Sequence, residues 1–464
     1  MLGSGPVAPS ATEEVPAPPP RRRLRPSAIW EVERSLKVKW TWKRGSGETS
    51  TAVAVAVCLA ASACGGAPSG PSSGPGTKLA AATSTYSAYT GGKPGKADSS
   101  RSPISLGWIN NEGGVPSFPE ATVAAEAAVR FVNEQLGGVG GHPVSLSKCI
   151  IVSAEEQGQT CAQQLLNAPS VNVITEGGVA VGAQAFHRTL DGRKPVVIPV
   201  PLNIADATAR NAYAPGAGVF GTSPGFVGYV TGYLHARSVA LLNPGDDPTG
   251  VLAGKQIKDG LEKAGVTVKQ AAYQTTASDY LSFVVASSAA TADATVGLFP
   301  SPPTCIAGAK ALQQANVTKP IVGLGLCIAD PVQKALGDFP KWTYIFATEN
   351  PNLPAADPFV AGYVDVMHAY APQGANLGGF APSAFAGILM DIKLLNQVGT
   401  DNLTAETIAA AARAYRGPAP LLPPDLNYGT IPGLPTLGTL STRAYTYSGD
   451  ANWKDATGGK WITP

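Results

Sequence analysis

Apolar and polar positions follow two alternating periodicities along most of the chain after residue 103. Residues 104–109 form a short apolar run of the kind found in buried strands. In the next segment, residues 119–136, apolar residues recur at four-residue steps from Val123 to Phe131. This spacing predicts a helix with one apolar face, and the tandem glycines 137–138 predict its end.

The same order of strand and helix repeats as far as residue 324. Further strands are expected at residues 144–152, 171–174, 195–200, 239–242, 266–271, 294–299 and 320–324, and further helices at 161–166, 251–264, 280–290 and 306–315. Proline behind a capping residue marks expected helix starts at Ser223-Pro224, Asp247-Pro248, Asp330-Pro331 and Asp357-Pro358. Strands that alternate with helices form parallel sheets through right-handed crossovers. Since these units are too many for one open sheet, the chain is predicted to be α/β with two Rossmann-like lobes.

A different pattern precedes this region. Residues 51–64 form a short apolar run that ends in small residues and Cys64, with Lys43-Arg44 upstream. These are the parts of a secretory signal, and the run is too short to cross a bilayer as a helix. A cysteine directly after small residues resembles the bacterial lipobox, so we expect lipidation of Cys64; the alternative is an ordinary cleaved signal.

Composition divides the N-terminal region further. Residues 1–37, rich in proline and arginine, fit no secretory pattern and point to a translation start near Val38, so residues 1–63 are a leader whose signal is 38–63. Residues 64–102 are rich in Gly, Ser, Pro and Ala and predict a flexible tether. The leader holds nine of the 34 basic and five of the 32 acidic residues. The remainder therefore carries a net charge of −2, which disfavours nucleic acid as a partner.

Four cysteines remain after the leader. An even number in an exported chain predicts disulfides, and four cysteines allow three pairings. We favour the short-range pairing, Cys149 with Cys161 and Cys305 with Cys327, because each pair lies within one strand–loop–helix neighbourhood. Metal ligation is the alternative, but the chain has no CxxC pair and its four histidines are scattered. No metal and no cofactor are therefore expected.

One stretch of the chain carries a family resemblance. Residues 132–144 contain Val132-Asn133-Glu134, then Gly137-Gly138-Val139 and Gly141-His142-Pro143-Val144, and Ile321-Val322-Gly323-Leu324 before Asp330-Pro331 is a second, weaker match. The order resembles the type I periplasmic solute-binding proteins, most closely the branched-chain amino-acid-binding family of ABC importers. The resemblance covers residues 103–464. It implies two lobes joined by three chain crossings, near residues 220–221, 347–349 and 418–424.

These crossings divide the mature chain. We expect one lobe from residues 103–220 and 348–420, and the other from 221–347 and 421–464. Ligands of open α/β sheets bind beyond the carboxyl ends of the strands, so the loops at those ends are the candidate site. The candidate ligand-binding residues are Asn110, Asn111, Glu112, Gly177, Gly178, Val200, Leu202, Asn203, Phe299 and Leu326.

The residues at these loops bear on the class of ligand. The family holds an amino acid through small hydroxyl residues in the third loop and through an acidic residue after the strand that matches residues 321–324. This chain has Val200-Pro201-Leu202 and Gly325-Leu326 at those positions. An ammonium group buried without a carboxylate is costly, so the pattern favours a less polar solute, unless Glu112, Glu176 or Glu349 supplies the charge.

The function that we expect is that of an extracytoplasmic substrate-binding lipoprotein. It would be a monomer on the outer face of the cytoplasmic membrane that delivers a small solute, such as an amino acid or an amide, to an ABC permease. A ligand-sensing receptor without transport and a secreted hydrolase are the alternatives. The chain contains no HExxH motif, no Walker loop and no GxGxxG after its first strand, so we expect no enzyme.

Overall fold

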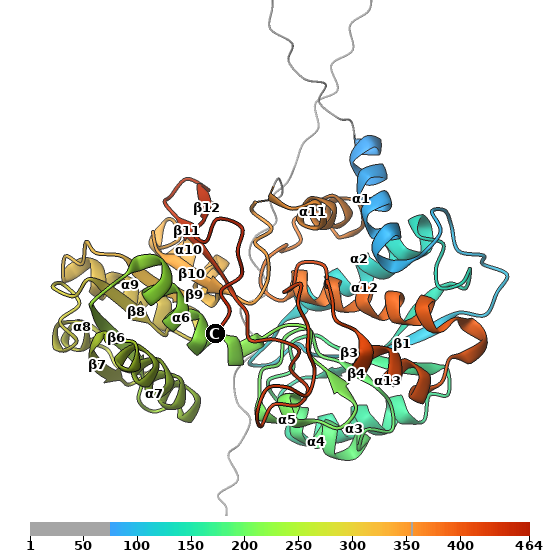
Figure 1. Ribbon diagram of the computed structural model, residues 1–464, viewed down its shortest axis with the longest axis horizontal. Helices are drawn as coiled ribbons and strands as arrows, with labels where there is room; N and C mark the ends of the chain where they lie inside the picture. Colours follow the sequence, from blue (N-terminus) through green and yellow to red (C-terminus); the bar gives the residue numbers. More distant parts are fainter. Residues whose placement is uncertain (1–74, 354–355) are drawn as a thin grey trace, which may run out of the picture. The chain divides into compact units, whose positions relative to one another are not determined.

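The computed structural model describes residues 75–353 and 356–464 of the chain. These residues form two α/β sheets, each with helices on both faces (Figure 1). We call each sheet with its helices a lobe. The leader and residues 64–74 of the expected tether, which include the expected lipidation site Cys64, lie outside the described residues.

The first lobe is built on a five-stranded parallel sheet in the order β2-β1-β3-β4-β5. Its strands are β1 (Ile104–Asn111), β2 (Val144–Ile151), β3 (Val171–Glu176), β4 (Val196–Val197) and β5 (Ala212–Tyr213). Its helices are α1 (Pro75–Thr90), α2 (Pro119–Gln135), α3 (Glu155–Leu166), α4 (Ala183–Leu190), α5 (Ile204–Thr208), α11 (Pro358–Tyr370), α12 (Ala381–Val398) and α13 (Ala405–Ala414). The helical periodicity predicted for 119–136 is thus confirmed.

Each face of this sheet has its own apolar core. Trp108 packs with Phe131 of α2 and Leu389 of α12, whereas Ile109 packs with Phe186 of α4. Successive side chains of a strand point to opposite faces, which explains why neighbours in β1 belong to different cores. Figure 1 shows α2 and α12 on one side of the strands and α3, α4 and α5 on the other.

The second lobe contains a seven-stranded sheet in the order β12-β11-β10-β9-β8-β6-β7. Its strands are β6 (Ser238–Pro244), β7 (Thr267–Tyr273), β8 (Ala294–Gly297), β9 (Ile321–Leu324), β10 (Thr343–Phe346), β11 (Arg443–Tyr447) and β12 (Trp453–Asp455). Its helices are α6 (Thr222–Tyr229), α7 (Pro248–Lys263), α8 (Leu281–Ala286), α9 (Pro302–Gln314) and α10 (Asp330–Leu336). A sheet with only parallel strands was expected, but β11 runs antiparallel to both β10 and β12 because β11 and β12 form a hairpin.

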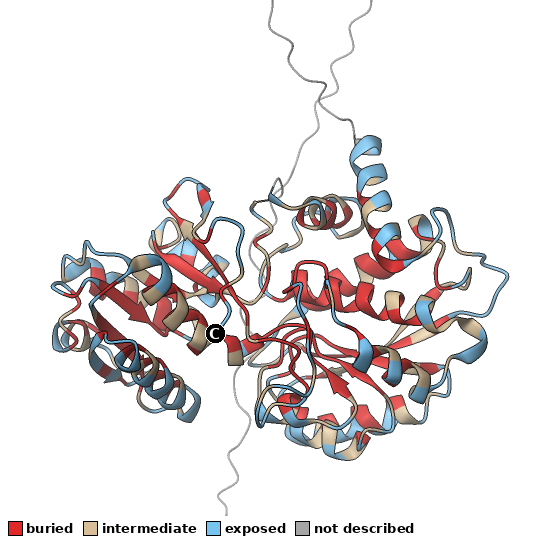
Figure 2. Cartoon of the chain, viewed as in Figure 1, coloured by how far each residue is buried: buried red, intermediate tan, exposed pale blue. Residues whose placement is uncertain are grey.

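Alternation along β6 shows how this sheet is covered. Val239 and Leu241 are buried in a core with Ile257 of α7, while Ala240 and Leu242 face the opposite core. Figure 2 shows the same arrangement as buried strands between helices whose outer faces are exposed. The central strands are therefore covered on both faces, as parallel strands require.

The expectation of a flexible tether is wrong for residues 75–102, because they are docked on the first lobe. α1 buries Ala82, Tyr86 and Tyr89, which are spaced to share one helical face, against α11 and α12. The Tyr86 hydroxyl donates to the carbonyl oxygen of Phe359 at 2.6 Å, and Lys393 Nζ donates to that of Tyr89 at 2.8 Å. Alanine and serine fill much of this helix, so its composition resembles that of a linker.

The third chain crossing also lies elsewhere than expected. Leu421, Leu422 and Leu426 are buried in the core that contains α12, and Leu437 is buried in the core that contains α4. Residues 421–440 therefore pack with the first lobe, and the chain enters the second sheet only at β11. The proline-rich sequence looks like a linker, but its leucines are core residues.

The two expected disulfides are confirmed. Cys149 and Cys161 join β2 to α3, and Cys305 and Cys327 join the first turn of α9 to the 3₁₀ turn Gly325–Cys327. The expected helix starts are confirmed in two of four cases. Asp247 and Asp357 accept hydrogen bonds from the first N–H groups of α7 and α11, whereas α6 and α10 begin at Thr222 and Asp330, with no capping bond from a side chain.

Candidate ligand-binding site

Asn110, near the end of β1, is fully buried and its side chain is engaged inside the protein. Its oxygen accepts the N–H of Gly178 at 2.8 Å, and its amide donates to the Phe118 carbonyl oxygen at 2.7 Å and to the Glu112 carboxylate at 3.0 Å. The Glu112 carboxylate also accepts a hydrogen bond from the Thr122 hydroxyl. These residues therefore hold the loop after β1 to the loop after β3.

Asn111, the last residue of β1, has a matching role. It is fully buried, and its side-chain oxygen accepts the N–H groups of Ala180 and Val181 at 2.7 and 3.0 Å. Its amide donates to the Val181 carbonyl oxygen at 3.1 Å. Asn111 thus shapes the loop that follows Gly178, and its polar atoms are used within the first lobe.

Gly177 and Gly178 follow β3 directly and lie against the end of β1. The N–H of Gly177 donates to the Ile109 carbonyl oxygen at 2.8 Å, and that of Gly178 is bound by Asn110. A Cβ atom on Gly178 would lie 2.5 Å from the ring of Phe118. Glycine is therefore needed here for close packing, and the N–H groups of both candidate residues are engaged within the first lobe.

The third loop, after β4, is held by a buried carboxylate that the sequence analysis did not single out. Asp206 Oδ2 accepts the N–H groups of Leu202 at 2.7 Å and of Asn203 at 3.3 Å. Asn203 caps α5 and donates to the Val179 carbonyl oxygen at 3.0 Å. Val200 is 9% exposed. This loop and the loop after β3 are therefore connected by hydrogen bonds.

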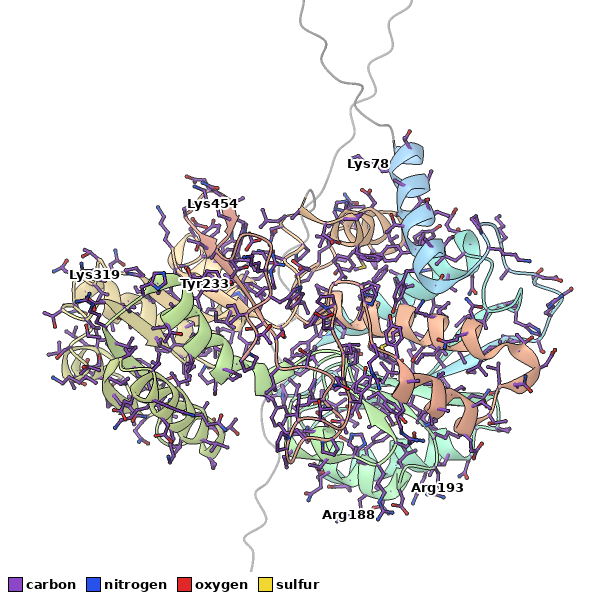
Figure 3. The ribbon with its side chains drawn as sticks, in the orientation of Figure 1. Lys78, Arg188, Arg193, Tyr233, Lys319 and Lys454 are labelled. Carbon is purple, nitrogen blue, oxygen red and sulfur yellow. A yellow bond between two sulfur atoms is a disulfide. The ribbon has the colours of Figure 1, made fainter. Side chains whose placement is uncertain are left out.

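A buried cluster of Glu176, His187 and Asp206 lies beneath these two loops. His187 Nε2 lies 3.0 Å from Glu176 Oε1 and 3.5 Å from Asp206 Oδ1. The three side chains are 7% exposed or less, whereas the next residue along α4, Arg188, lies at the outer surface of the lobe (Figure 3). Residues from β3, α4 and α5 thus meet at one buried point.

Electrostatics at this cluster favour positive charge. Burial by itself would lower the pKa of His187, but the carboxylates of Glu176 and Asp206 raise it to about 10. Burial raises the pKa of Glu176 to about 7, against the opposing effect of His187. The cluster is chemically distinct from the solvent-exposed ion pairs of the surface, such as Arg210 with Asp191.

The strand-end loops of the second lobe differ from the expectation at one residue. Phe299 is fully buried, with its ring 5.7 Å from that of Tyr273 and 5.9 Å from that of Trp342. A Cβ atom on Gly308 would lie 2.4 Å from the Phe299 ring. Phe299 is therefore a core residue, and its assignment to the ligand site is wrong. Leu326, by contrast, is 47% exposed.

Glu349 follows β10 and is paired within the second lobe. Arg443 Nη1 lies 2.9 Å from Glu349 Oε1, and Arg443 Nη2 lies 2.7 Å from Asp455 Oδ2. The Tyr445 hydroxyl donates to the second oxygen of Glu349. The three acidic residues considered as partners of a ligand ammonium, Glu112, Glu176 and Glu349, are thus all engaged with side chains of the protein itself.

One further buried carboxyl carries no local sequence signal, because its partner lies far away in the chain. The Thr175 hydroxyl is hydrogen-bonded to the buried carboxyl of Asp391 across 216 residues, and burial raises the pKa of Asp391 to about 7.

Residues 221–225 spell G-x-S-x-G, the letters of a hydrolase nucleophile elbow. Ser223, however, is 5% exposed and lies in the first turn of α6 behind a 3₁₀ turn, not at the end of a strand.

Comparison with known proteins gives a family and a fold. The sequence profile of the periplasmic binding protein family matches residues 103–427. No curated protein matches the sequence. Among the residues that the structure describes, no helix combines the length and the apolarity needed to cross a membrane.

Three similar solved structures are binding proteins with different ligands in their names. A leucine-binding protein from Thermotoga maritima has a TM-score of 0.60 and 14% identity, over 78% of this chain and 99% of that one. A solute-binding protein of an R. palustris ABC transporter in complex with 4-hydroxybenzoate has a TM-score of 0.60 and 17% identity, over 78% of this chain and 96% of that one. A fatty acid ABC transporter substrate-binding protein from Thermomonospora curvata has a TM-score of 0.58 and 17% identity, over 80% of this chain and 94% of that one. At these identities the likeness shows the fold alone.

Proposed function

Because the chain belongs to the periplasmic binding protein family, we propose that it is the extracytoplasmic substrate-binding protein of an ABC importer for a weakly polar organic solute. The ligand is held at the strand-end loops of the two lobes. The loops after β1, β3 and β4 serve in the first lobe, and those after β8 and β9 in the second. Closure of the lobes about the ligand supplies the signal that a permease recognises.

The chemistry of the ligand follows from the state of the acidic residues. Glu112, Glu176 and Glu349 are each engaged by side chains of the protein; Glu176 is buried, and the side chain of Glu349 is 13% exposed. To pair with a ligand ammonium, a carboxylate would have to give up these contacts, and an ammonium left unpaired in a closed site costs several kcal/mol, on the order of the penalty for a buried charge. A solute without an ammonium group, such as an amide, an aromatic acid or a short acyl chain, avoids this cost.

The ligand class is tested with matched pairs of compounds. Valine and isovalerate differ only in the α-amino group, and valinamide and isovaleramide differ in the same way, with an amide in place of the carboxylate. Measured by thermal shift and calorimetry with the full-length protein, isovalerate, isovaleramide, 4-hydroxybenzoate or octanoate should raise the melting temperature, and the amine-bearing partners should not. Valine that binds more tightly than isovalerate would refute the ligand class. Turnover of a bound compound, followed by mass spectrometry, would instead indicate a hydrolase.

Anchoring and delivery need separate experiments. We propose that Cys64 is lipidated, so the protein from the native membrane should carry a diacylglyceryl group at Cys64, and Cys64→Ala should move it to the soluble fraction. Recovery of unmodified Cys64 in the membrane-bound protein would refute the anchor. Loss of uptake of the bound solute in cells without this protein supports transport. Unchanged uptake with a lost transcriptional response would indicate a sensor.

A further inference from the structure

The cluster of Glu176, His187 and Asp206 has unsatisfied polar atoms at its centre. Glu176 Oε1, His187 Nε2 and Asp206 Oδ1 are buried, and none of them has a hydrogen-bond partner of acceptable geometry. Buried polar atoms in native proteins are nearly always paired. Three such atoms in one place, each from a different element of the first lobe, call for a physical explanation.

The distances show what is unusual about the arrangement. Nε2 lies 3.0 Å from Oε1 and 3.5 Å from Oδ1, yet neither contact has the direction of a hydrogen bond from the ring N–H. The three atoms all lie within 4.8 Å of one another. The ring nitrogen therefore lies near both carboxylate oxygens without a well-directed hydrogen bond to either.

A cation between the three atoms accounts for both observations. Nitrogen and oxygen ligands bind Zn²⁺ at ~2.1 Å, so neighbouring ligand atoms at coordination angles between octahedral and tetrahedral lie ~3.0–3.4 Å apart. The two distances from Nε2 are close to this range. One imidazole nitrogen and two carboxylate oxygens suit Zn²⁺ or Mn²⁺ better than Ca²⁺ or Mg²⁺, which prefer oxygen alone.

We propose that Glu176, His187 and Asp206 form a structural binding site for one divalent transition-metal ion in the first lobe. The other oxygen of Asp206 holds the N–H groups of Leu202 and Asn203, and Glu176 directly precedes Gly177. The ion therefore ties the loops after β3 and β4 together from below. The proposal is independent of the organic ligand, because the metal site lies within one lobe and needs no closure.

The competing explanation is an imidazolium ion between two carboxylates with no metal. This arrangement leaves one negative charge uncompensated and leaves the ring N–H without a well-directed acceptor. The two explanations differ in stoichiometric metal binding, which can be measured without any knowledge of the solute. They also differ in the effect of a chelator, since an imidazolium pair does not respond to one.

The test uses the full-length protein, stripped with EDTA and dialysed. Titration with Zn²⁺ and then Mn²⁺ by calorimetry, with bound metal counted by mass spectrometry, should give one equivalent per chain, and Ca²⁺ should bind at least tenfold more weakly. Glu176→Gln and His187→Gln should each lower the Zn²⁺ affinity at least tenfold. His368→Gln removes an exposed histidine of α11 and should leave the affinity unchanged.

The outcomes separate the explanations. No saturable binding of Zn²⁺ or Mn²⁺ by the wild-type protein overturns the metal site, as does binding that survives both Glu176→Gln and His187→Gln. An equal loss of Zn²⁺ affinity in His368→Gln means that exposed histidines bind the metal, which also overturns the proposal. If His187→Gln does not fold, Glu176→Gln decides. Hydrogen exchange provides the second measurement. Addition of EDTA to the metal-loaded wild-type protein should speed backbone exchange at residues 200–203, because the loop after β4 loses its link to the ion.

Discussion

The loops that follow the strands are fixed by different means in the two lobes. In the first lobe, the loops after β1, β3 and β4 are joined by buried polar side chains, namely Asn110, Asn111 and Asp206. In the second lobe, the loops after β8 and β9 are joined by a covalent bond between Cys305 and Cys327. The first solution depends on hydrogen bonds and protonation, whereas the second depends on oxidation.

This difference has consequences for how each lobe responds to its surroundings. Buried hydrogen-bonded networks lose their partners one at a time, and each orphaned group costs free energy. A disulfide acts mainly by restricting the unfolded chain. We therefore expect point substitutions and pH to act on the loops after β1, β3 and β4 of the first lobe, and reducing conditions to act on the loops after β8 and β9 of the second.

The largest expected effect comes from the disulfide of the second lobe. Cys305→Ser with Cys327→Ser should lower the free energy of unfolding by about 3 kcal/mol, by loop-closure entropy. The same double change should speed hydrogen exchange at residues 300–304 and 325–328. Cys149→Ser with Cys161→Ser is the control; it opens a shorter loop in the first lobe, with a sequence separation of 12 rather than 22. It should cost a similar amount in denaturant unfolding but leave exchange at those two loops unchanged; equal exchange in both variants contradicts the comparison.

Asn111→Ala should produce the next largest effect. The substitution leaves the N–H groups of Ala180 and Val181 without their acceptor, at a cost of about 2 kcal/mol. Urea unfolding measures the loss, and thermal shift with the identified solute measures its effect on binding. Asn402→Ala, at an exposed position, should change unfolding by less than about 0.5 kcal/mol. A loss below that value for Asn111→Ala would show that the loop does not depend on this side chain.

Asp391 should make the stability of the first lobe depend on pH. Its carboxyl ionises near pH 4 in the unfolded chain, but burial raises its folded pKa to about 7. The native state therefore holds the proton more tightly, and stability falls as pH rises from about 4 to 7. Asp391→Asn should flatten this part of the curve in unfolding measured at several pH values. Asp401→Asn, at an exposed site, should not; a curve unchanged by Asp391→Asn contradicts the assignment.

The smallest effect is expected at the surface of the second lobe. Lys255 and Asp259 form an ion pair one turn apart on α7, with side chains 68% and 56% exposed. Exposed pairs of this kind contribute about 0.3–0.5 kcal/mol and are screened by salt. Lys255→Ala should therefore lower the free energy of unfolding by no more than about 0.5 kcal/mol. A loss above about 1 kcal/mol would contradict the small contribution expected of an exposed pair.

The fold could be predicted from sequence because it depends on local periodicity. Short apolar runs and four-residue spacing placed most of the strands and helices from β1 to β9 within a few residues. The disulfide pairs could be predicted because each joins neighbouring elements. α1 and the segment 421–440 were missed for one shared reason. Their buried residues, such as Tyr86 and Leu437, are few and stand among alanine, glycine or proline, so composition resembles that of a linker.

The candidate site was predictable only in its location. The position of Asn111, Gly177 and Asn203 at strand ends follows from the order of elements. What their side chains contact does not, because those contacts join residues far apart in the chain, such as Asn111 with Val181. The meeting of Glu176, His187 and Asp206 likewise needs three separate elements, and the scattered histidines gave no signal for it. Phe299 was misassigned because the sequence does not show to which side of a strand end a ring turns.

The docked helix α1 shortens the reach of the mature protein. If Cys64 is the anchored residue, eleven peptide units separate it from Pro75, the first residue of α1. A fully extended chain of this length spans at most about 40 Å, whereas a free segment to residue 102 would span more than three times as far. The first lobe would thus stay within one protein diameter of the lipid surface. A captured solute would therefore be held close to the membrane surface, whereas a longer free segment would let the lobes move farther away from it.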